Sequence, residues 1–330
     1  MTSKKKLRIG IPNLSKPEGP KIFLSRLIRN IEAQHLAKSV SFLSPFYDIG
    51  LFNSVSRSFY RKPFVLRLDG IAFDAKETIG PNKKINKPIF ESIMNASGVV
   101  YQSVFTKALI ESYLGFEKKP FQIIGNGVDL KHFSPSGNNH RDRLNIPSDA
   151  IVMLTSAAWR SHKRLNDILK IFFHLEKEGH DDIHLIIIGG GSEIIPKHDR
   201  IHCSGLVRPD NLPAWYRSGD FFIYLSWLDN CPNTVVEAVA SGLPVICTNQ
   251  GGTKEIIERT SAGIVVNADK PYHFGLVDMY NPPKPHYRKI VDAISEVKQN
   301  LDTYKRRIDP RGIDISLIAK EYLDFLRNCI

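Results

Sequence analysis

The chain has 330 residues, of which 42% are hydrophobic, and a formal net charge of +11 at pH 7. This length and apolar content are sufficient for two domains of ordinary size, each with its own core. The four cysteines show neither paired metal-ligand spacing nor the density of a disulfide-rich secreted protein, and no signal peptide or membrane span is visible. We therefore expect a cytoplasmic protein without a metal site.

The positive charge is confined to one half of the sequence. Counting Lys and Arg against Asp and Glu, residues 1–143 carry +12 and residues 144–330 carry −1. A basic half favours an anionic partner, such as a lipid phosphate, a membrane surface or a nucleic acid. The alternative is a solvated basic face without a partner, because only Lys4–Lys6 forms a run.

The first 130 residues alternate between short apolar runs and segments of helical periodicity. They begin with a strand, a polar loop and a helix within residues 7–34, which predicts a doubly wound α/β domain. Further strands are expected at 39–44, 63–68 and 98–102, and further helices at 85–97 and 103–114.

Two residues of this half lie where a parallel sheet commonly binds ligands. Gly19 precedes the first helix, where a glycine lets the backbone approach a ligand closely. Asp69 lies between the end of the 63–68 strand and Gly70, at the carboxyl edge of the expected sheet. An ordinary turn is the alternative at both positions, because Gly and Asp-Gly are common turn residues.

The polar segment Ser134–Arg143 contains Gly and Pro and predicts an interdomain linker, which a second α/β domain follows. Arg160 and Lys163 lie in the first strand-to-helix loop of that domain and face the carboxyl edge of its sheet. We expect Arg164 to be a surface charge on the first helical turn. Strands are expected at 151–155, 183–188, 201–205, 221–225, 245–248 and 263–267, and helices at 165–178, 212–217, 233–241, 287–300 and 316–327.

The stretch Asp220–Ile257 organises this second half. It has the pattern of a βαβ unit, whose 226–232 loop lies at the carboxyl edge of the sheet. The first turn of the following helix, residues 233–235, directs backbone N–H groups into that loop, which favours a bound anion.

Two acids accompany this predicted anion site. Helical spacing places Asn233, Thr234 and Glu237 on one face of the helix. Asp229 lies in the loop, eight positions before Glu237. Amides on phosphate and carboxylates on hydroxyls would suit a sugar ligand that carries phosphate.

These residues resemble the donor-binding signature of GT-B glycosyltransferases of retaining family 4, the glycosyl transferases group 1. The resemblance consists of Asp229 and Glu237 flanking seven residues, the Gly242–Val245 strand, and the Gly251–Gly252 turn with its acid, Glu255. Family members mostly carry Glu at the first acid, where this chain has Asp229.

The resemblance implies two Rossmann-like doubly wound parallel-sheet domains that face each other across a cleft. Residues 1–140 would form the acceptor domain and residues 141–314 the nucleotide-sugar donor domain. A C-terminal helix, residues 315–330, would cross back to the first domain. The 121–135 segment resembles the strand and Asn-Gly-Val-Asp turn that close the first domain in the family.

The resemblance also implies a role for each candidate residue. At the usual position of the diphosphate-binding arginine this chain has Ala158, so Arg160 would replace it. For the diphosphate the implied residues are Arg160, Lys163, Gly19 and the backbone of Asn233, Thr234 and Val235; for the nucleoside they are Gly190, Leu206, Val207 and Glu237. Asp229 would bind the transferred sugar, and Asp69 would orient or deprotonate the acceptor hydroxyl.

The implied function is metal-independent, retaining transfer of a sugar from a UDP- or GDP-sugar to a glycan, glycolipid or protein-linked glycan. No cofactor is expected apart from this donor substrate. Three alternatives remain open: a catalytically silent nucleotide-sugar binding protein, a GT-B epimerase or phosphorylase, and a nucleic-acid binder. Only the basic half favours the last one, because the sequence has no recognised nucleic-acid module.

Overall fold

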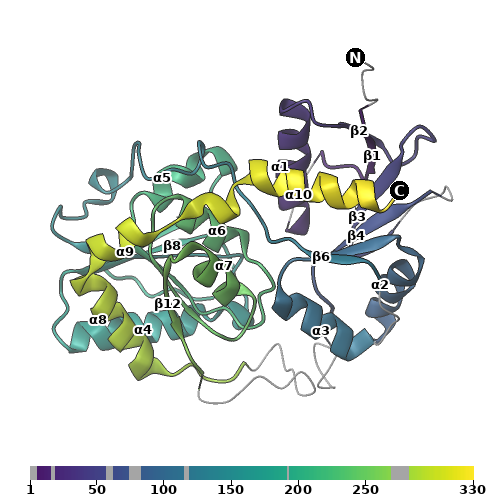
Figure 1. The fold of residues 1–330 in the computed structure, drawn as a ribbon. Coiled ribbons are helices and arrows are strands. Elements are labelled where there is room, and N and C mark those ends of the chain that lie inside the picture. The colour runs from purple at the N-terminus through teal and green to yellow at the C-terminus, as the bar shows by residue number, and fades with distance from the viewer. Residues whose placement is uncertain are drawn as a thin grey trace. The chain divides into compact units, whose positions relative to one another are not determined.

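A computed structural model describes residues 6–15, 19–56, 62–73, 83–114, 119–191, 193–268 and 282–330 (Figure 1). These residues form two compact units. The first contains the described residues up to Val128 together with Ile313–Ile330, and the second contains those from Asp129 to Gly312. Among the described helices, none is long and apolar enough to cross a membrane.

The first unit is a doubly wound α/β domain. Its six-stranded sheet has the order β2-β1-β3-β4-β5-β6, and all of these strand pairs are parallel. The strands are β1 (Arg8–Ile11), β2 (Lys38–Ser41), β3 (Ile49–Asn53), β4 (Phe64–Leu68), β5 (Gly98–Tyr101) and β6 (Phe121–Ile123). The helices are α1 (Pro20–Ala33), α2 (Lys83–Asn95), α3 (Val104–Leu114) and α10 (Ile315–Asn328).

Alternation along the strands gives this unit one core on each face of its sheet. Val65 packs with residues of α1 and α10, whereas its neighbours Phe64 and Leu66 pack with residues of α2 and α3. Successive strand residues point to opposite faces, so both faces need apolar side chains. The sequence analysis missed β3, a five-residue strand that interrupts a region of turns.

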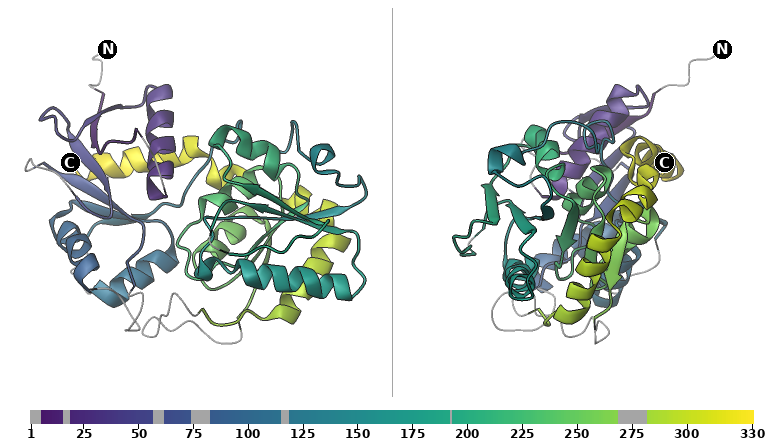
Figure 2. Two further views of the ribbon diagram at one scale, coloured as in Figure 1. Left: turned by 180° about the vertical axis from the view of Figure 1, so that it is seen from behind. Right: turned by 90° about the vertical axis from the view of Figure 1, so that its left-hand side faces the viewer.

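The C-terminal helix α10 belongs to the first unit, as the resemblance implied. It lies beside α1 in the ribbon views (Figure 2), and the rings of Tyr322 and Phe23 are 5.9 Å apart. Seven of its residues are buried: Ile315, Ile318, Ala319, Tyr322, Leu323, Phe325 and Leu326.

The second unit is also a doubly wound α/β domain. Its parallel sheet has the order β12-β11-β10-β7-β8-β9. The strands are β7 (Ile151–Ser156), β8 (Ile183–Ile188), β9 (Ile201–Gly205), β10 (Phe221–Tyr224), β11 (Val245–Thr248) and β12 (Gly263–Val266). The α-helices are α4 (Leu165–Lys177), α5 (Leu212–Tyr216), α6 (Asn233–Ala240), α7 (Thr253–Thr260), α8 (Tyr287–Gln299) and α9 (Leu301–Arg307), and the short 3-10 turns are η1 (Asp142–Leu144), η2 (Ser161–Lys163), η3 (Pro209–Asn211) and η5 (Pro310–Ile313).

The segment expected to be a linker, residues 134–143, packs against the second unit. Arg141 donates to the carbonyl oxygen of Ser218 over 3.0 Å and forms an ion pair with Asp220. His140 lies against the ring of Trp215, with centroids 4.7 Å apart. Polar residues of this segment therefore contact α5 and the residues that connect α5 to β10.

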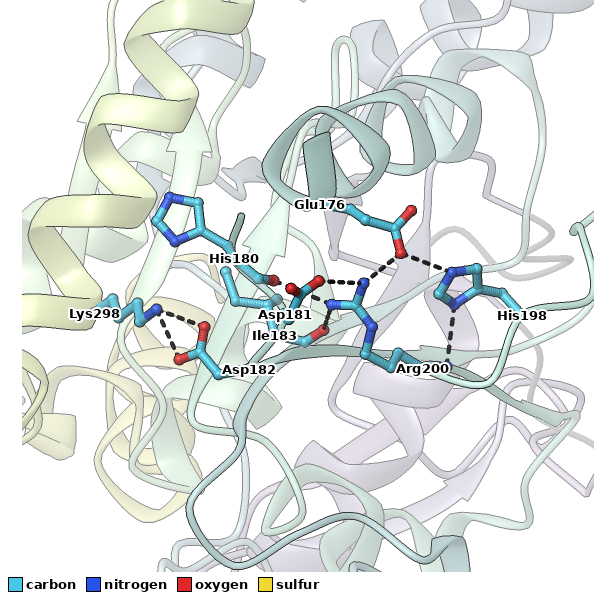
Figure 3. Close-up of polar contacts among 8 residues, drawn as sticks. All are labelled: Glu176, His180, Asp181, Asp182, Ile183, His198, Arg200 and Lys298. Carbon is cyan, nitrogen blue, oxygen red and sulfur yellow. Dashed lines mark hydrogen bonds and ion pairs between the residues drawn. The ribbon is translucent and has the colours of Figure 1, made fainter. Parts of the chain in front are cut away.

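Charged residues connect helices α4 and α8 with the amino end of the second sheet (Figure 3). Arg200 forms an ion pair with Glu176 of α4 and donates to the carbonyl oxygen of Ile183 over 3.2 Å. Lys298 of α8 donates to Asp182 over 2.7 Å. These contacts pair the charges at this end of the sheet with one another, and we assign them a structural role.

Candidate functional site

Three loops meet at the carboxyl edge of the second sheet. They follow β7, β10 and β11, which are adjacent strands, and they lead into η2, α6 and α7. In parallel sheets this edge is where ligands bind, because the connecting loops carry side chains and helix N-termini there. Arg160, Lys163 and Asp229 lie on these loops, and the four candidates within residues 233–237 lie on α6, which follows one of them.

An ion pair between Lys163 of η2 and Asp229 of the β10–α6 loop forms the charged centre of this edge. Tyr224, the last residue of β10, donates its hydroxyl proton to Asp229 Oδ2 over 2.7 Å. Lys163 Nζ also contacts the Tyr224 hydroxyl oxygen, at 3.2 Å. Only 17% of each charged side chain is exposed.

The ion pair keeps both groups charged. Burial opposes the charge of Lys163, but the attraction and hydrogen bonds of Asp229 and Tyr224 together outweigh it and raise the pKa of Lys163. Burial likewise opposes the charge of Asp229, and Lys163 nevertheless holds the pKa of Asp229 below its ordinary value. Burial, with Lys163 adding to it, lowers the pKa of the neighbouring His162 to about 4, so this imidazole is neutral at pH 7.

Backbone hydrogen bonds fix the loop that carries Asp229. They join Trp227 N to His162 O (2.8 Å), Leu228 N to Gln250 O (3.0 Å) and Gly252 N to Asp229 O (2.8 Å). Leu228 adopts a left-handed conformation with φ 58°. At Gly251 a Cβ atom would lie 2.8 Å from the carbonyl oxygen of Asp229, so this turn requires glycine. Asp229 therefore lies on a loop whose backbone is tied to both neighbouring loops.

Helix α6 begins directly after this loop. Its N-cap is Pro232, which offers no side-chain acceptor for the N–H groups of the first turn. Asn233 and Thr234 are half-buried there, whereas Val235 is buried. Glu237, one turn further on, is 3% exposed and accepts a hydrogen bond from the Tyr216 hydroxyl over 2.9 Å. The sequence analysis did not anticipate this orienting contact.

Four further candidates lie at the ends of β7, β8 and β9. Arg160 is exposed at the start of η2. The carbonyl oxygen of Gly190 accepts a hydrogen bond from Trp159 N over 2.9 Å, and a Cβ atom on Gly190 would lie 3.4 Å from Leu206 Cγ. Leu206 is 87% exposed and Val207 is half-buried. The fold therefore brings Gly190 and Leu206 together at the same edge.

The remaining candidates belong to the first unit. Asp69 follows β4 and forms an ion pair with Arg67, a residue that is only 1% exposed. Gln102 donates to the same carboxylate oxygen over 2.6 Å. Gly19 is the exposed N-cap of α1 with φ 51°, a conformation that favours glycine.

The structure contradicts the expectation for Arg164. This residue is 2% exposed, and its guanidinium contacts Leu225, Gln250 and Pro283 instead of solvent. The prediction was wrong because Arg164 is in a left-handed conformation, with φ 58°, and is the N-cap of α4 rather than a residue of its first turn. Its side chain therefore points into the protein, towards Leu225 and Gln250.

Comparison with known proteins identifies the family of this site. Residues 149–275 match the family described as glycosyl transferases group 1. That match covers β7 to β12 and includes Lys163, Asp229 and Glu237. Residues 149–275 form a glycosyl transferases group 1 domain.

Relatives and solved structures resemble more of the chain. Spore coat protein SA of Bacillus subtilis (strain 168) is 25% identical over 66% of this chain, and D-inositol 3-phosphate glycosyltransferase of Streptomyces bingchenggensis is 26% identical over 49%. These matches span 64% and 40% of the relatives' own lengths. Sucrose-phosphate synthase from Thermosynechococcus elongatus superimposes with a TM-score of 0.76 at 13% identity, covering 98% of this chain and 99% of that chain. Anabaena HepE, solved with UDP, gives a TM-score of 0.69 at 15% identity, covering 98% and 100%.

These structures show that the chain has the GT-B fold. The group 1 match, residues 149–275, lies in the part of the chain that contains the loops after β7, β10 and β11. Tyr224, Tyr216 and Arg164 are the residues of this domain's edge that sequence reasoning missed. The two tyrosines lie in apolar or aromatic runs, where they resemble core residues, and only the fold shows that their hydroxyls reach Asp229 and Glu237.

Proposed function

We propose that this chain transfers a sugar from a nucleoside-diphosphate sugar to an acceptor hydroxyl. The observation that carries the proposal is the pair of Lys163 and Asp229 beside the start of α6, within a glycosyl transferases group 1 domain. A cation and a helix N-terminus suit a diphosphate, and a carboxylate suits sugar hydroxyls. Structures of the similarly folded HepE contain UDP or UDP-glucose. A relative is named GDP-mannose-dependent alpha-mannosyltransferase. These names support UDP and GDP as candidate nucleotides of the donor.

The proposed roles follow the geometry of the edge. Glu237, oriented by Tyr216, accepts hydrogen bonds from the ribose hydroxyls, and Asp229 binds the transferred sugar. The backbone N–H groups at the start of α6 bind phosphate together with Lys163 and Arg160. Gly190, Leu206 and Val207 surround the base.

The proposed reaction is metal-independent and retains the anomeric configuration. The bond from the anomeric carbon to the phosphate oxygen breaks, and its electron pair stays on the phosphate. Lys163 and the α6 amides stabilise that charge as it develops. The leaving phosphate takes the proton of the acceptor hydroxyl on the same face of the sugar, where the new bond forms.

We assign the acceptor to the first unit and propose that it is anionic or lies at a membrane surface. The excess positive charge lies in residues 1–143, and the apolar side chains of Leu43 and Phe46 are 57% and 66% exposed. Arg67 and Gln102 already stabilise the charge of Asp69, so we assign this carboxylate the orientation of the acceptor hydroxyl. Four free cysteines suit a reducing, cytoplasmic compartment.

The test is a product assay with UDP-, GDP- and ADP-sugars, each incubated with and without glycan or glycolipid acceptors. We expect one donor to release nucleoside diphosphate, and NMR of the product to show the donor's anomeric configuration. Binding without any release would instead support a silent nucleotide-sugar binding protein. Phosphate-dependent release or an epimerised donor would support a phosphorylase or an epimerase.

A further inference from the structure

We propose that Arg164 is a positioning residue of the donor site. Its buried guanidinium holds the Lys163 loop, the end of β10 and the β11–α7 turn in the arrangement that receives the diphosphate. This inference deepens the proposed function and rests on it. It concerns a side chain that contacts the β10–α6 loop, the β11–α7 turn and Pro283.

The backbone at Arg164 indicates that side-chain contacts hold it in place. The residue joins η2 to α4 with φ 58° and ψ 38°, a left-handed conformation that a Cβ atom disfavours and that glycine adopts readily. Arginine also loses more side-chain freedom on burial than most residues. An arginine that is 2% exposed at such a position must therefore be stabilised by what its guanidinium contacts.

Those contacts come from three separate segments of the chain. Nη1 donates to the carbonyl oxygen of Leu225, immediately after β10, over 3.3 Å. Nη2 donates to Gln250 Oε1 in the β11–α7 turn over 3.3 Å, and also to the carbonyl oxygen of Pro283. The guanidinium carbon lies 5.7 Å from the centre of the Trp227 ring. A planar guanidinium can reach all of these acceptors at once, whereas a lysine ammonium on its single stem cannot.

The segments that Arg164 joins are those that carry the charged centre. Lys163 precedes it directly, and the carbonyl oxygen of His162 accepts the hydrogen bond of Trp227 N. Gln250 contacts Arg164 through its side chain and Leu228 N through its carbonyl oxygen. Loss of the guanidinium would therefore loosen both sides of the Lys163–Asp229 pair.

Arg164 also adds positive charge beneath this edge. Its carboxylate partner is Asp167, whose Oδ2 lies 4.0 Å from Nε and whose Oδ1 accepts a hydrogen bond from the Tyr287 hydroxyl over 2.6 Å. Burial lowers the pKa of Arg164 to about 10, which still leaves it charged at neutral pH. Because its other hydrogen-bond partners are neutral oxygens, this buried positive charge favours the binding of an anion at the neighbouring loops.

The variant Arg164→Gly tests the inference, because glycine suits the left-handed backbone while the guanidinium is removed. The matched control is Ser261→Gly, since Ser261 is exposed at the end of α7 and has φ 51°. The measurements are hydrogen exchange at the N–H groups of Trp227, Leu228 and Gly252, and calorimetric dissociation constants for UDP and GDP. We expect Arg164→Gly to exchange faster at these amides and to bind the preferred nucleotide at least tenfold more weakly, with the control unchanged in both.

Chemical rescue separates positioning from general destabilisation. Added ethylguanidinium should restore nucleotide affinity in Arg164→Gly, whereas ethylammonium at the same concentration should not. If Arg164→Gly fails to fold, Arg164→Lys is the deciding variant. We expect Arg164→Lys to fold and to bind the preferred nucleotide about three- to tenfold more weakly, because a single ammonium group replaces the guanidinium with its several N–H donors.

Unchanged nucleotide affinity in folded Arg164→Gly or in Arg164→Lys would overturn the inference, and so would unchanged amide exchange. If the unaltered protein binds no nucleoside diphosphate, it is the proposed function that fails. The exchange of the three amides would still show whether Arg164 holds the loops.

Discussion

Lys163 contacts both Asp229 and Tyr224, so a diphosphate that binds at this edge competes with a carboxylate for one ammonium group. The carboxylate also repels the phosphate charges. Asp229 is therefore expected to oppose nucleotide binding even though its proposed role is to bind the transferred sugar. Substitution of Asp229 should therefore strengthen nucleotide binding and slow sugar transfer.

Asp229→Asn should bind nucleoside diphosphate more tightly and transfer sugar more slowly. The amide keeps the shape of the side chain, but it neither repels phosphate nor pairs with Lys163 as a charge. We expect the dissociation constant to fall about three- to tenfold, which corresponds to roughly 0.6–1.4 kcal/mol. Calorimetry with UDP and GDP measures this change, and Asp210→Asn, at an exposed position of η3, is the control. Weaker binding in Asp229→Asn would contradict the competition.

Lys163→Ala should lower turnover of the donor by about 10²- to 10³-fold, the usual loss when one charge-stabilising donor is removed. The measurement is release of nucleoside diphosphate from the sugar donor in the presence of acceptor. Lys177→Ala, which removes an exposed charge from the last turn of α4, should leave turnover unchanged. A loss of less than about threefold in Lys163→Ala would remove Lys163 from the mechanism.

The candidate residues differ in how far sequence could predict them. The positions of Lys163, Asp229 and Glu237 at one sheet edge were predictable, because loop position and helical spacing specify the edge on which they lie. Arg164 was misread because a single left-handed residue redirects its side chain, and no local pattern signals that conformation for arginine. Contacts between distant segments, such as that of Tyr216 with Glu237, require the fold.

At the scale of elements, the alternation of strands and helices was largely predictable because strand and helix periods differ. Strand β3 was missed because Ile49–Asn53 is short and its apolar residues are not separated from those of the preceding turns. The sequence also could not show that residues 134–143 pack on the second unit, since polar side chains such as Arg141 find their partners far along the chain.

Helix α10 should contribute strongly to the stability of the first unit. Leu326 is fully buried in the core of the first unit, whereas Leu317 of the same helix is 45% exposed. Leu326→Ala should lower the free energy of unfolding by about 2–5 kcal/mol, and Leu317→Ala by less than about 0.5 kcal/mol. Urea unfolding followed by circular dichroism measures both changes. Equal effects would contradict the packing of α10 on this unit.

A histidine pair between β8 and β9 should make stability depend on pH. His184 Nδ1 and His202 Nε2 are 3.0 Å apart, and the rings are stacked. Burial, followed by the neighbouring His202 and Arg200, lowers the pKa of His184 to about 4, and burial also lowers the pKa of His202. The unfolded chain, where histidine has a pKa near 6.5, therefore binds more protons than the folded chain between about pH 4 and pH 6.5.

The free energy of unfolding should consequently have its full value above pH 6.5 and decrease as the pH falls from 6.5 towards 4. Denaturant titrations at several pH values measure this slope. His184→Gln should make the slope shallower, while His132→Gln, at an exposed position of the second unit, should leave it unchanged. A slope that His184→Gln does not alter would exclude the pair as its source.

At the scale of the whole molecule, two parallel sheets of six strands place their loops by the same rule, at the carboxyl edge. The fold class was predictable because this pattern repeats twice in the sequence. The second unit was predictable in more detail than the first, because the motif on which the family resemblance mainly rests lies within it. The proposed acceptor would depend on the surface of the first unit, where positive charge and the exposed Leu43 and Phe46 favour an anionic or membrane-bound partner.

The central claim is that the edge around Lys163, Asp229 and α6 binds a nucleoside diphosphate, and a thermal-shift screen against UDP, GDP, ADP and their sugar conjugates tests it most directly. A nucleotide at about 100 times its dissociation constant should stabilise the protein by roughly 2.7 kcal/mol. In a domain of this size each kcal/mol raises the melting temperature by about 2–4 °C. We predict that one base raises the melting temperature clearly and that Glu237→Ala reduces this shift. If no nucleotide shifts the melting temperature, the edge is not a donor site and the account is contradicted.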